Sequence, residues 1–391
     1  NFKQLFGQIV FIAFYNACFF VKKRLYEGTH AQHNVCDARR YVGVTNPDAI
    51  REFIRNTYEP NYAYTKHHLA EGDGKIEAIF TDEPSFMGCY INLGLYPPHV
   101  HDAYDDEIPL YPVVSFGRDV ENQFMARYAY PLAYNLIYLF MGEDERAKQV
   151  RYDYYRLLSD LYEQSYFAQL SNWCAAHGLS FSGHILLEDD IRHHVVFEGN
   201  FFALLRHMHT PGIDMLHSIP TRVYQDAFTP KLVSSIARAY GRPHVMSEVS
   251  AHAQGGKVTP MQMYASMSLQ YALGVDTFTS YYSEKQAEPE LYRQLNEALG
   301  RADALMQGRH RANVMLYYPI ETMQMHHRPS DAQYGTYTEA ENACKLNLMA
   351  IQNTLLDNQI DFDYADYDVL SRMTVCEDGT LREQLVASMR R

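Results

Sequence analysis

The stretch IFTDEPS, residues 79–85, decides the fold that we expect for this chain. It closes an apolar run, Ile76–Thr81, with two adjacent carboxylates, and a proline directly after them stops the strand. Parallel α/β folds display their reacting groups at the carboxyl ends of the strands. Because successive side chains of a strand point to opposite sides, only one of Asp82 and Glu83 faces the axis of the sheet squarely. We therefore expect a functional carboxylate here; a cap on a following helix is the alternative.

A second apolar run delivers another carboxylate in the same way. The run His244–Ser247 ends at Glu248, and a glycine-bearing loop, Gln254–Gly256, follows. Alone, Glu248 could equally belong to a surface ion pair. Together with Glu83 it forms the kind of pair that cleaves a glycosidic bond, in which one carboxyl donates a proton and the other is ionised.

Outward from these segments, short apolar runs alternate with amphipathic stretches. Further strands are expected at Gln8–Tyr15, Leu179–His184, Ile213–His217 and Val275–Tyr282. Helices are expected at Pro47–Tyr58, within Val120–Ala176, and at Pro230–Tyr240, Pro260–Leu273 and Pro289–Met306. Strands that are apolar throughout and alternate with helices predict a parallel sheet covered on both faces. The stretch Ser85–Asp119 is too long for a plain connection and is expected to be a functional loop.

A domain boundary is expected near residues 308–311. A new strand, Asn313–Tyr318, a helix, Thr338–Asn358, and a second strand, Ile360–Tyr364, open another α/β unit. We therefore divide the chain into residues 1–307 and 308–391. The turn after the first of these strands has no glycine-rich phosphate loop, so a nucleotide cofactor is not expected.

The composition of the chain limits the classes of partner and ligand that we expect. The 391 residues carry a net charge of −13, which argues against a nucleic acid or an anionic membrane surface. No apolar run is long enough to span a membrane. The six cysteines form no CxxC pair and no HExxH motif occurs, so neither a metal nor a cofactor is expected. The 32 tyrosines suit a cleft for polar, ring-shaped ligands, although they can also fill a large core.

The chain resembles the clan A glycoside hydrolases in two respects. It has two carboxylates at the ends of strands that are three strands apart, and it contains the segments Trp173–Leu179 and Phe181–His184. The resemblance implies a (β/α)8 TIM barrel with Glu83 as acid/base and Glu248 as nucleophile. A barrel followed by an α/β unit is similar to the family 42 β-galactosidases. That likeness implies a flavodoxin-like second domain and a homotrimer.

The chain departs from this pattern in three respects. Asp82 stands where the clan usually has asparagine, and its charge would raise the proton affinity of Glu83. The only tryptophan, Trp173, lies on a helix and is expected in packing, so Tyr281 or Tyr282 would supply the aromatic face for a sugar. One convincing strand precedes Glu83, so the first barrel strands are expected to be missing from the chain, and localisation stays open between the cytoplasm and the periplasm or exterior.

The ends of the expected strands also predict which residues would bind substrate. In addition to Asp82, they are Tyr15, Asn16, His184, Glu188, His217, His252, Tyr281 and Tyr282. His184 could instead be a satisfied core histidine. Asp214 is expected to be structural, as a cap or in an ion pair.

We therefore expect a retaining, exo-acting glycosidase that acts on a carbohydrate through Glu83 and Glu248. Two alternatives remain open. One is a metal-dependent barrel enzyme that uses Asp82, Glu83, His184, His217 and Glu248. The other is a barrel that binds carbohydrate without catalysis.

Overall fold

The computed structural model describes most of the chain between residues 42 and 376. The described residues are 20–21, 39–40, 42–70, 76–86, 114–116, 118–251, 254–282, 288–306, 308, 310, 312–329, 337–376 and 381–383. The expected strand Gln8–Tyr15, the candidate residues Asn16 and His252, and most of the 85–119 loop lie outside them.

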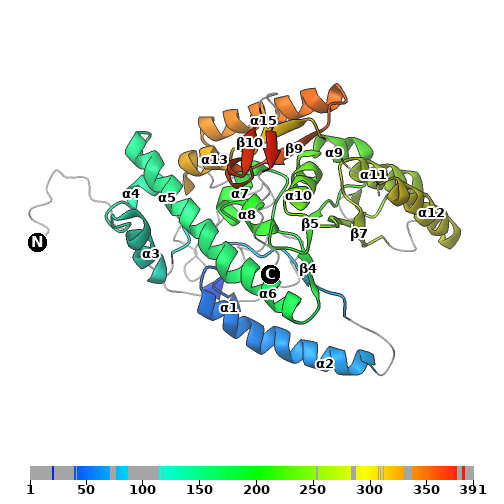
Figure 1. Cartoon of the computed structure of the whole chain (residues 1–391), viewed down its shortest axis with the longest axis horizontal. Coiled ribbons are helices and arrows are strands. Elements are labelled where there is room, and N and C mark those ends of the chain that lie inside the picture. The colour runs from blue at the N-terminus through cyan, green and yellow to red at the C-terminus, as the bar shows by residue number, and fades with distance from the viewer. Residues whose placement is uncertain are drawn as a thin grey trace, which may run out of the picture.

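A curled sheet of five parallel strands organises the molecule (Figure 1). The strands pair in chain order, and they are β3 (Ala78–Thr81), β4 (Ser180–Gly183), β5 (Thr210–Asp214), β6 (Met246–Val249) and β7 (Thr277–Ser280). All four pairings are parallel, as the apolar runs predicted. In the part of the chain that the structure describes, the sheet has the form of half a barrel, so the expected eight-stranded barrel is not confirmed.

Two glycines allow neighbouring strands of this sheet to approach each other. Gly183 has φ +130°, and a Cβ there would lie 2.0 Å from the carbonyl oxygen of Thr81. A Cβ on Gly212 would lie 2.4 Å from the carbonyl oxygen of Gly183 and 2.4 Å from the Met246 methyl carbon. No side chain fits either position, so glycine is required where β3, β4 and β5 meet.

Helix starts follow their capping residues. Asn46 accepts hydrogen bonds from the first turn of α1 (Pro47–Phe53). Capping boxes start α11 (Pro260–Ala272) at Thr259 and α15 (Glu339–Asp357) at Thr338. The starts of α1 and α11 confirm the predicted ones, and α15 begins one residue after the predicted Thr338, which is its N-cap.

The expected long helical tract is divided into five elements. They are α3 (Arg118–Tyr128), α4 (Ile137–Phe140), α5 (Glu145–Tyr162), the π-helix η4 (Glu163–Phe167) and α6 (Ala168–Ala176). The first break comes at Ala129, which has φ +61°, and Pro131 and Gly142 keep the following region irregular.

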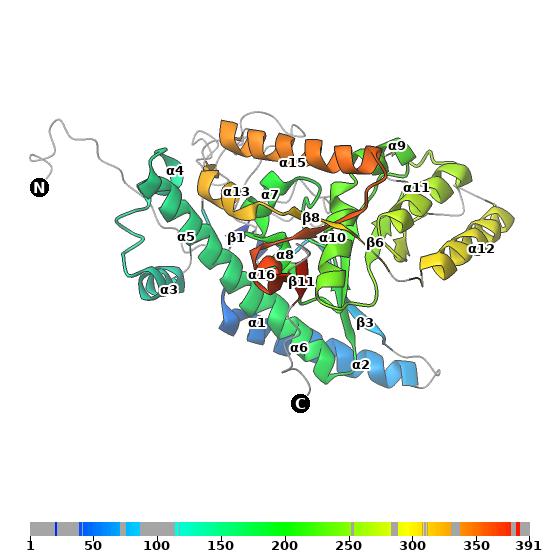
Figure 2. The ribbon, with the colours of Figure 1, turned by 45° about the horizontal axis from the view of Figure 1, so that its top comes forward.

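The remaining helices surround the sheet. They are the π-helix η3 (Ile54–Tyr58), α2 (Glu59–Ala70), α7 (Ile191–Phe197), α8 (Phe201–Leu205), α9 (Pro220–Gln225), α10 (Phe228–Ala239), α12 (Pro289–Met306), α13 (Ile320–His326) and α16 (Tyr367–Ser371). Helices α1, α2 and α6 lie on one side of the molecule and α13 and α15 on the opposite side (Figures 1 and 2). None of the helices that the structure describes combines the length and apolarity needed to cross a bilayer.

The C-terminal part packs against the curled sheet's helical layer. Its strands β8 (Val314–Tyr317) and β9 (Phe362–Ala365) pair in parallel, and β9 lies against α10. Short antiparallel pairs join β10 (Met373–Val375) to β11 (Leu381–Glu383) and β1 (Phe20–Val21) to β2 (Arg39–Arg40). The fold here is α/β as expected, but two parallel strands do not establish a flavodoxin-like domain.

A single hydrophobic cluster runs through both expected domains. It contains Phe181 and Ile213 of the sheet together with Tyr318 and Phe362 of the C-terminal part. Trp173 also belongs to this cluster, where it stacks on His177 at a centroid distance of 4.1 Å. The boundary at residues 308–311 stays a prediction.

Candidate functional site

Acidic and imidazole side chains from four neighbouring strands meet at the carboxyl edge of the sheet. Glu83 follows β3, His184 follows β4, Asp214 ends β5 and Glu248 lies in β6. Asp214 and Glu248 are direct partners in the β5–β6 register. The parallel register therefore brings both expected catalytic glutamates to one edge of one sheet.

His184 lies at the centre of this group and is fully buried. Its Nε2 lies 3.1 Å from Oε2 of Glu248 and 3.4 Å from Oδ1 of Asp82. Burial by itself lowers the pKa of His184, but the hydrogen bond to Glu248 and the charges of Glu188 and Asp214 raise it to about 10. The ring is therefore an imidazolium at neutral pH and donates to the Glu248 carboxylate.

Glu83 occupies an environment that keeps its carboxyl protonated. Burial raises the pKa of Glu83 to about 8; His184 opposes this rise, while Asp82, Asp214 and Glu248 add to it. Asp82 acts in the direction expected from the sequence, but burial is the larger cause. A carboxyl that stays protonated at neutral pH can act as a general acid.

The backbone at Glu83 is held in an unusual conformation. Its φ of +48° lies in the left-handed region, which residues other than glycine rarely adopt. Two contacts support the strand end on either side of it. The Thr81 hydroxyl lies 2.8 Å from the Tyr166 hydroxyl of η4, and the backbone N–H of Phe86 donates to the carbonyl of Phe197 at 2.8 Å. Strained residues of this kind gather at functional sites, where the surroundings maintain them.

Asp214 belongs to the site, although sequence analysis placed it among structural residues. Burial raises the pKa of Asp214 to about 7; His184 opposes this rise and Glu248 adds to it. No hydrogen-bond partner for its Oδ1 occurs in the described part of the chain. The available signal was its position at the end of a strand lying between those of His184 and Glu248.

Glu188 and Glu198 form a second layer of buried carboxyls. Oε1 of Glu188 accepts the backbone N–H of Asp214 at 2.5 Å, so Glu188, which we expected to bind substrate, supports the end of β5. Burial and the nearby Glu188 raise the pKa of Glu198 well above its ordinary value, although the backbone of Leu186 acts in the opposite direction. Glu198 lies at the end of a helix, and no motif in the sequence marked it.

Three of these side chains could share a cation. The potential ligand atoms of His184, Asp214 and Glu248 all lie within 4.8 Å of one another. An imidazole and two carboxylates are a suitable donor set for a divalent metal. His217, which the metal-dependent alternative included, is not in this group; its Nδ1 lies 3.5 Å from Nε2 of Gln254.

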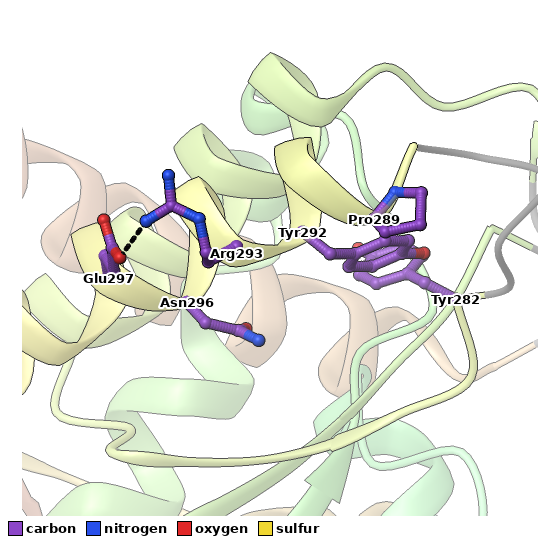
Figure 3. Close-up of a pocket in the computed structure, with 6 residues that line it drawn as sticks. All are labelled: Tyr282, Pro289, Tyr292, Arg293, Asn296 and Glu297. Carbon is purple, nitrogen blue, oxygen red and sulfur yellow. Dashed lines mark hydrogen bonds and ion pairs between the residues drawn. The ribbon is translucent and has the colours of Figure 1, made fainter.

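Tyr281 and Tyr282 diverge after β7. Burial raises the pKa of Tyr281, and the charges of Glu248, Asp82 and Asp214 add to the rise, so its ring lies within electrostatic range of the site. Tyr282 pairs with the Ser218 hydroxyl instead and lines a separate cavity beside α12 (Figure 3). Of the two tyrosines, Tyr281 is therefore the one whose hydroxyl is influenced by the charges of the candidate site.

Comparison with solved structures finds matches to this chain. A rhamnosidase from Novosphingobium sp. PP1Y matches with a TM-score of 0.53 and 14% identity over 88% of this chain and 31% of its own. A GH42 β-galactosidase from G. stearothermophilus matches with a TM-score of 0.45 and 10% identity over 66% of this chain and 45% of its own. No family model matches the chain, and no curated protein matches its sequence. The fold of this chain is thus similar to part of the rhamnosidase structure, of whose length the chain spans about a third.

Proposed function

We propose that this protein is a glycoside hydrolase in which Glu83 is the acid and Glu248 the nucleophile. The observation that carries the proposal is the difference between these two groups at one edge of the sheet. The Glu83 carboxyl, with its pKa raised to about 8, is protonated, whereas the Glu248 carboxylate accepts a hydrogen bond from an imidazolium. Glycosidase chemistry requires this combination of acid and base forms. The glycosidase-like fold adds support.

The reaction proceeds in two steps. A sugar ring binds beside Tyr281, and Glu83 donates its proton to the glycosidic oxygen as the bond to the anomeric carbon breaks. Glu248 attacks that carbon and forms a glycosyl-enzyme. The Glu83 carboxylate then takes a proton from water, whose oxygen releases the sugar with retained configuration. His184 orients the Glu248 carboxylate and balances its charge before it attacks and after the sugar is released; in the glycosyl-enzyme Glu248 is an uncharged ester.

A panel of aryl glycosides tests the proposal. Rhamnosides and galactosides come first, because the structural neighbours are a rhamnosidase and a β-galactosidase. We expect wild type to release the aryl group from at least one of them and Glu83→Gln to lose the activity on substrates with poor leaving groups. Sugar binding without any turnover would favour a carbohydrate-binding protein and refute the enzyme.

The role of Glu248 has its own test. The variant Glu248→Gly should be inactive and should recover turnover in azide, which replaces the missing nucleophile and yields a glycosyl azide. Proton NMR of the first-formed product reports the stereochemistry. An inverted product, without azide rescue, would make Glu248 a general base instead, which requires carboxyl groups about 6.5–9.5 Å apart rather than about 5–5.5 Å.

A metal-dependent enzyme is the second candidate, favoured by the arrangement of His184, Asp214 and Glu248. It predicts a bound divalent ion in the purified protein and loss of activity after dialysis against a chelator. The hydrolase proposed above predicts unchanged activity under the same treatment. Elemental analysis before and after dialysis separates the two.

A further inference from the structure

A fully buried histidine joins the C-terminal part of the molecule to the loop that follows β4. His194 lies in α7, and its ring packs on the rings of Phe201 and Phe228 at centroid distances of 4.8 and 5.9 Å. Its Nδ1 lies 2.7 Å from the hydroxyl of Tyr318, and its Nε2 lies 2.9 Å from the backbone carbonyl oxygen of Glu188. All three of these polar residues are buried. Both ring nitrogens therefore have a partner inside the core.

The chemistry of the partners fixes the direction of these hydrogen bonds. Burial lowers the pKa of His194 to about 4, although the bond to Glu188 acts in the opposite direction, so the ring is neutral and carries one proton. Because a carbonyl oxygen can only accept, that proton is on Nε2, and Nδ1 accepts the O–H of Tyr318. Burial also raises the pKa of Tyr318 well above its ordinary value, so its hydroxyl keeps its proton. The bonds thus form one chain from Tyr318 through His194 to Glu188.

This chain of bonds continues to the backbone of the candidate site. Oε1 of Glu188 accepts the N–H of Asp214 at 2.5 Å, and the N–H of the next residue, Met215, donates to the carbonyl of Glu248 at 3.0 Å. Asp214 and Glu248 are also direct partners in the β5–β6 register. The end of β5 is therefore bonded to Glu188 on one side and to Glu248 on the other, so a shift of the loop at residue 188 reaches the backbone of the proposed nucleophile.

Packing alone does not require a polar chain at this place. An apolar side chain at position 194 could fill a similar volume without partners, whereas a buried imidazole costs free energy unless its nitrogens are bonded. Directional bonds instead fix the orientation of the elements that they join. Tyr318 is itself held in place, because it directly follows β8, which pairs with β9, and its N–H donates to the carbonyl of Ala365 at 2.9 Å.

We propose that Tyr318 and His194 are positioning residues for the candidate site, through which the strand pair β8–β9 fixes the end of β5 and the backbone of Glu248. The inference rests on the proposed glycosidase function and goes beyond it, because it gives the C-terminal part of the molecule a role in turnover. Neither residue acts on the sugar directly; both act through Glu188.

The first test removes one hydroxyl. Tyr318→Phe takes the donor from Nδ1 and frees the ring to release Glu188, so kcat should fall about 10-fold with KM within about 2-fold of wild type, because a displaced nucleophile slows bond formation. Tyr364→Phe is the matched control: Tyr364 is a second buried tyrosine in the same strand pair, but its hydroxyl bonds Oε1 of Gln352 at 2.7 Å. It should leave kcat and KM unchanged. Equal losses of kcat in the two variants would overturn the proposal.

The second test restores the chain with a different side chain. A glutamine can accept the O–H of Tyr318 through its oxygen and donate to the carbonyl of Glu188 through its nitrogen, whereas a leucine can do neither. His194→Gln should therefore keep kcat within about 3-fold of wild type, and His194→Leu should lower it about 10-fold. Tyr318→Phe should add no further loss to His194→Leu, since both variants break the same chain. Equal kcat values for His194→Gln and His194→Leu would contradict the inference.

A third test does not depend on activity. Hydrogen exchange of the Met215 amide reports its bond to the carbonyl of Glu248, and Tyr318→Phe should accelerate this exchange about 10-fold, whereas Tyr364→Phe should not. If wild type hydrolyses no glycoside, the proposed function fails by itself, and unchanged exchange in Tyr318→Phe then overturns the positioning chain separately. Nitrogen-15 NMR of wild type gives a check that needs no variant: a proton on Nδ1 of His194 rather than on Nε2 would refute the chain.

Discussion

Two clusters of charged side chains in this molecule differ in whether their charges are paired. The first joins α10 to β9. There Lys231 Nζ lies 2.7 Å from an Asp361 oxygen, and Arg238 Nε donates to an Asp363 oxygen at 2.8 Å. Burial alone would raise the pKa of Asp363, but His310 and Arg238 lower it well below its usual range. Every acid in this cluster has a cationic partner.

The second cluster is the candidate site at the carboxyl edge of the sheet. Its carboxyls Glu83, Asp214 and Glu248 share one cationic neighbour, His184, in the part of the chain that the structure describes. Burial therefore dominates, and the pKa values of Glu83 and Asp214 are raised to about 8 and about 7.

This difference indicates that the α10–β9 cluster stabilises the structure, whereas the candidate-site cluster is suited to proton transfer. Paired charges hold two elements together and resist titration, whereas unpaired buried acids remain ready to exchange a proton near neutral pH. The candidate-site cluster, in which one cation serves three carboxyls, also costs stability, as functional sites commonly do. Each prediction below alters either the candidate site, including its support, or the paired α10–β9 cluster.

The largest expected effect is the loss of the proton donor. Glu83→Gln should reduce kcat on glycosides with poor leaving groups by about 10³-fold, because the amide cannot donate a proton to the departing oxygen. Wild-type activity should fall as pH rises through about 8, where Glu83 ionises. Initial rates between pH 5 and 10 measure this fall, which is the alkaline limb of the pH–rate profile. Activity that instead rose through pH 8 would remove Glu83 from the acid's role.

The second-largest effect is expected from replacing His184, the cationic neighbour of the candidate-site carboxyls. His184→Gln keeps a hydrogen-bond donor near Glu248 but removes the charge, so kcat should fall by about 10²-fold. Because His184 lowers the pKa of Glu83, its loss should move the alkaline limb of the pH profile to higher pH. A profile that stays in place would show that the two side chains do not interact.

The third prediction contrasts the stability of the two clusters. The pKa of Glu83 rises from 4.5 to about 8 on folding, so ionisation destabilises the folded state as pH increases between these values. At pH 9, the free energy of unfolding of Glu83→Gln should therefore be about 2 kcal/mol greater than that of wild type. The free energies of unfolding of the two proteins should converge near pH 4.

The paired cluster should behave in the opposite way. Arg238→Met removes one of the two cationic partners of Asp363, Arg238 and His310, and should lower the free energy of unfolding by about 2 kcal/mol at pH 7. Arg51→Met, which breaks an exposed pair with Asp48, is the control and should cost less than about 0.5 kcal/mol. Urea denaturation measures all of these variants. A stabilising Arg238→Met would abolish the contrast between the clusters.

The smallest expected effect concerns the support beneath Glu83. Tyr166→Phe removes the hydroxyl that bonds Thr81, which should cost about 1 kcal/mol of stability. Because Thr81 leads into the strained residue, we also expect a loss of a few-fold in kcat with KM unchanged. A change in stability alone would limit Tyr166 to a structural role.

Much of the fold was predictable from local chemistry. The five parallel strands follow from continuous apolar runs, and the starts of α1, α11 and α15 follow from their caps. The division of residues 120–176 into several helices was missed, since the helical pattern continues across the breaks.

The site was less predictable than the sheet. Glu83, His184 and Glu248 were expected to lie together because strand ends in a parallel sheet share one edge, and the structure places all three at that edge. Asp214 was undervalued, since an isolated aspartate after a strand looks the same whether it caps a turn or faces a ligand. The sequence also could not distinguish Tyr281 from Tyr282 as the residue nearer the candidate site, because alternation along a strand does not reveal which side faces inward.

By itself, the sequence determined which residues form strands and which carboxylates end them, because apolar runs, prolines and caps act over a few neighbouring residues. Only the tertiary structure decided which of those carboxyls are protonated. Burial and the number of nearby cations set the pKa of Glu83, and those neighbours, from His184 to Glu248, lie 100 residues or more away in the chain and meet through the register of the sheet.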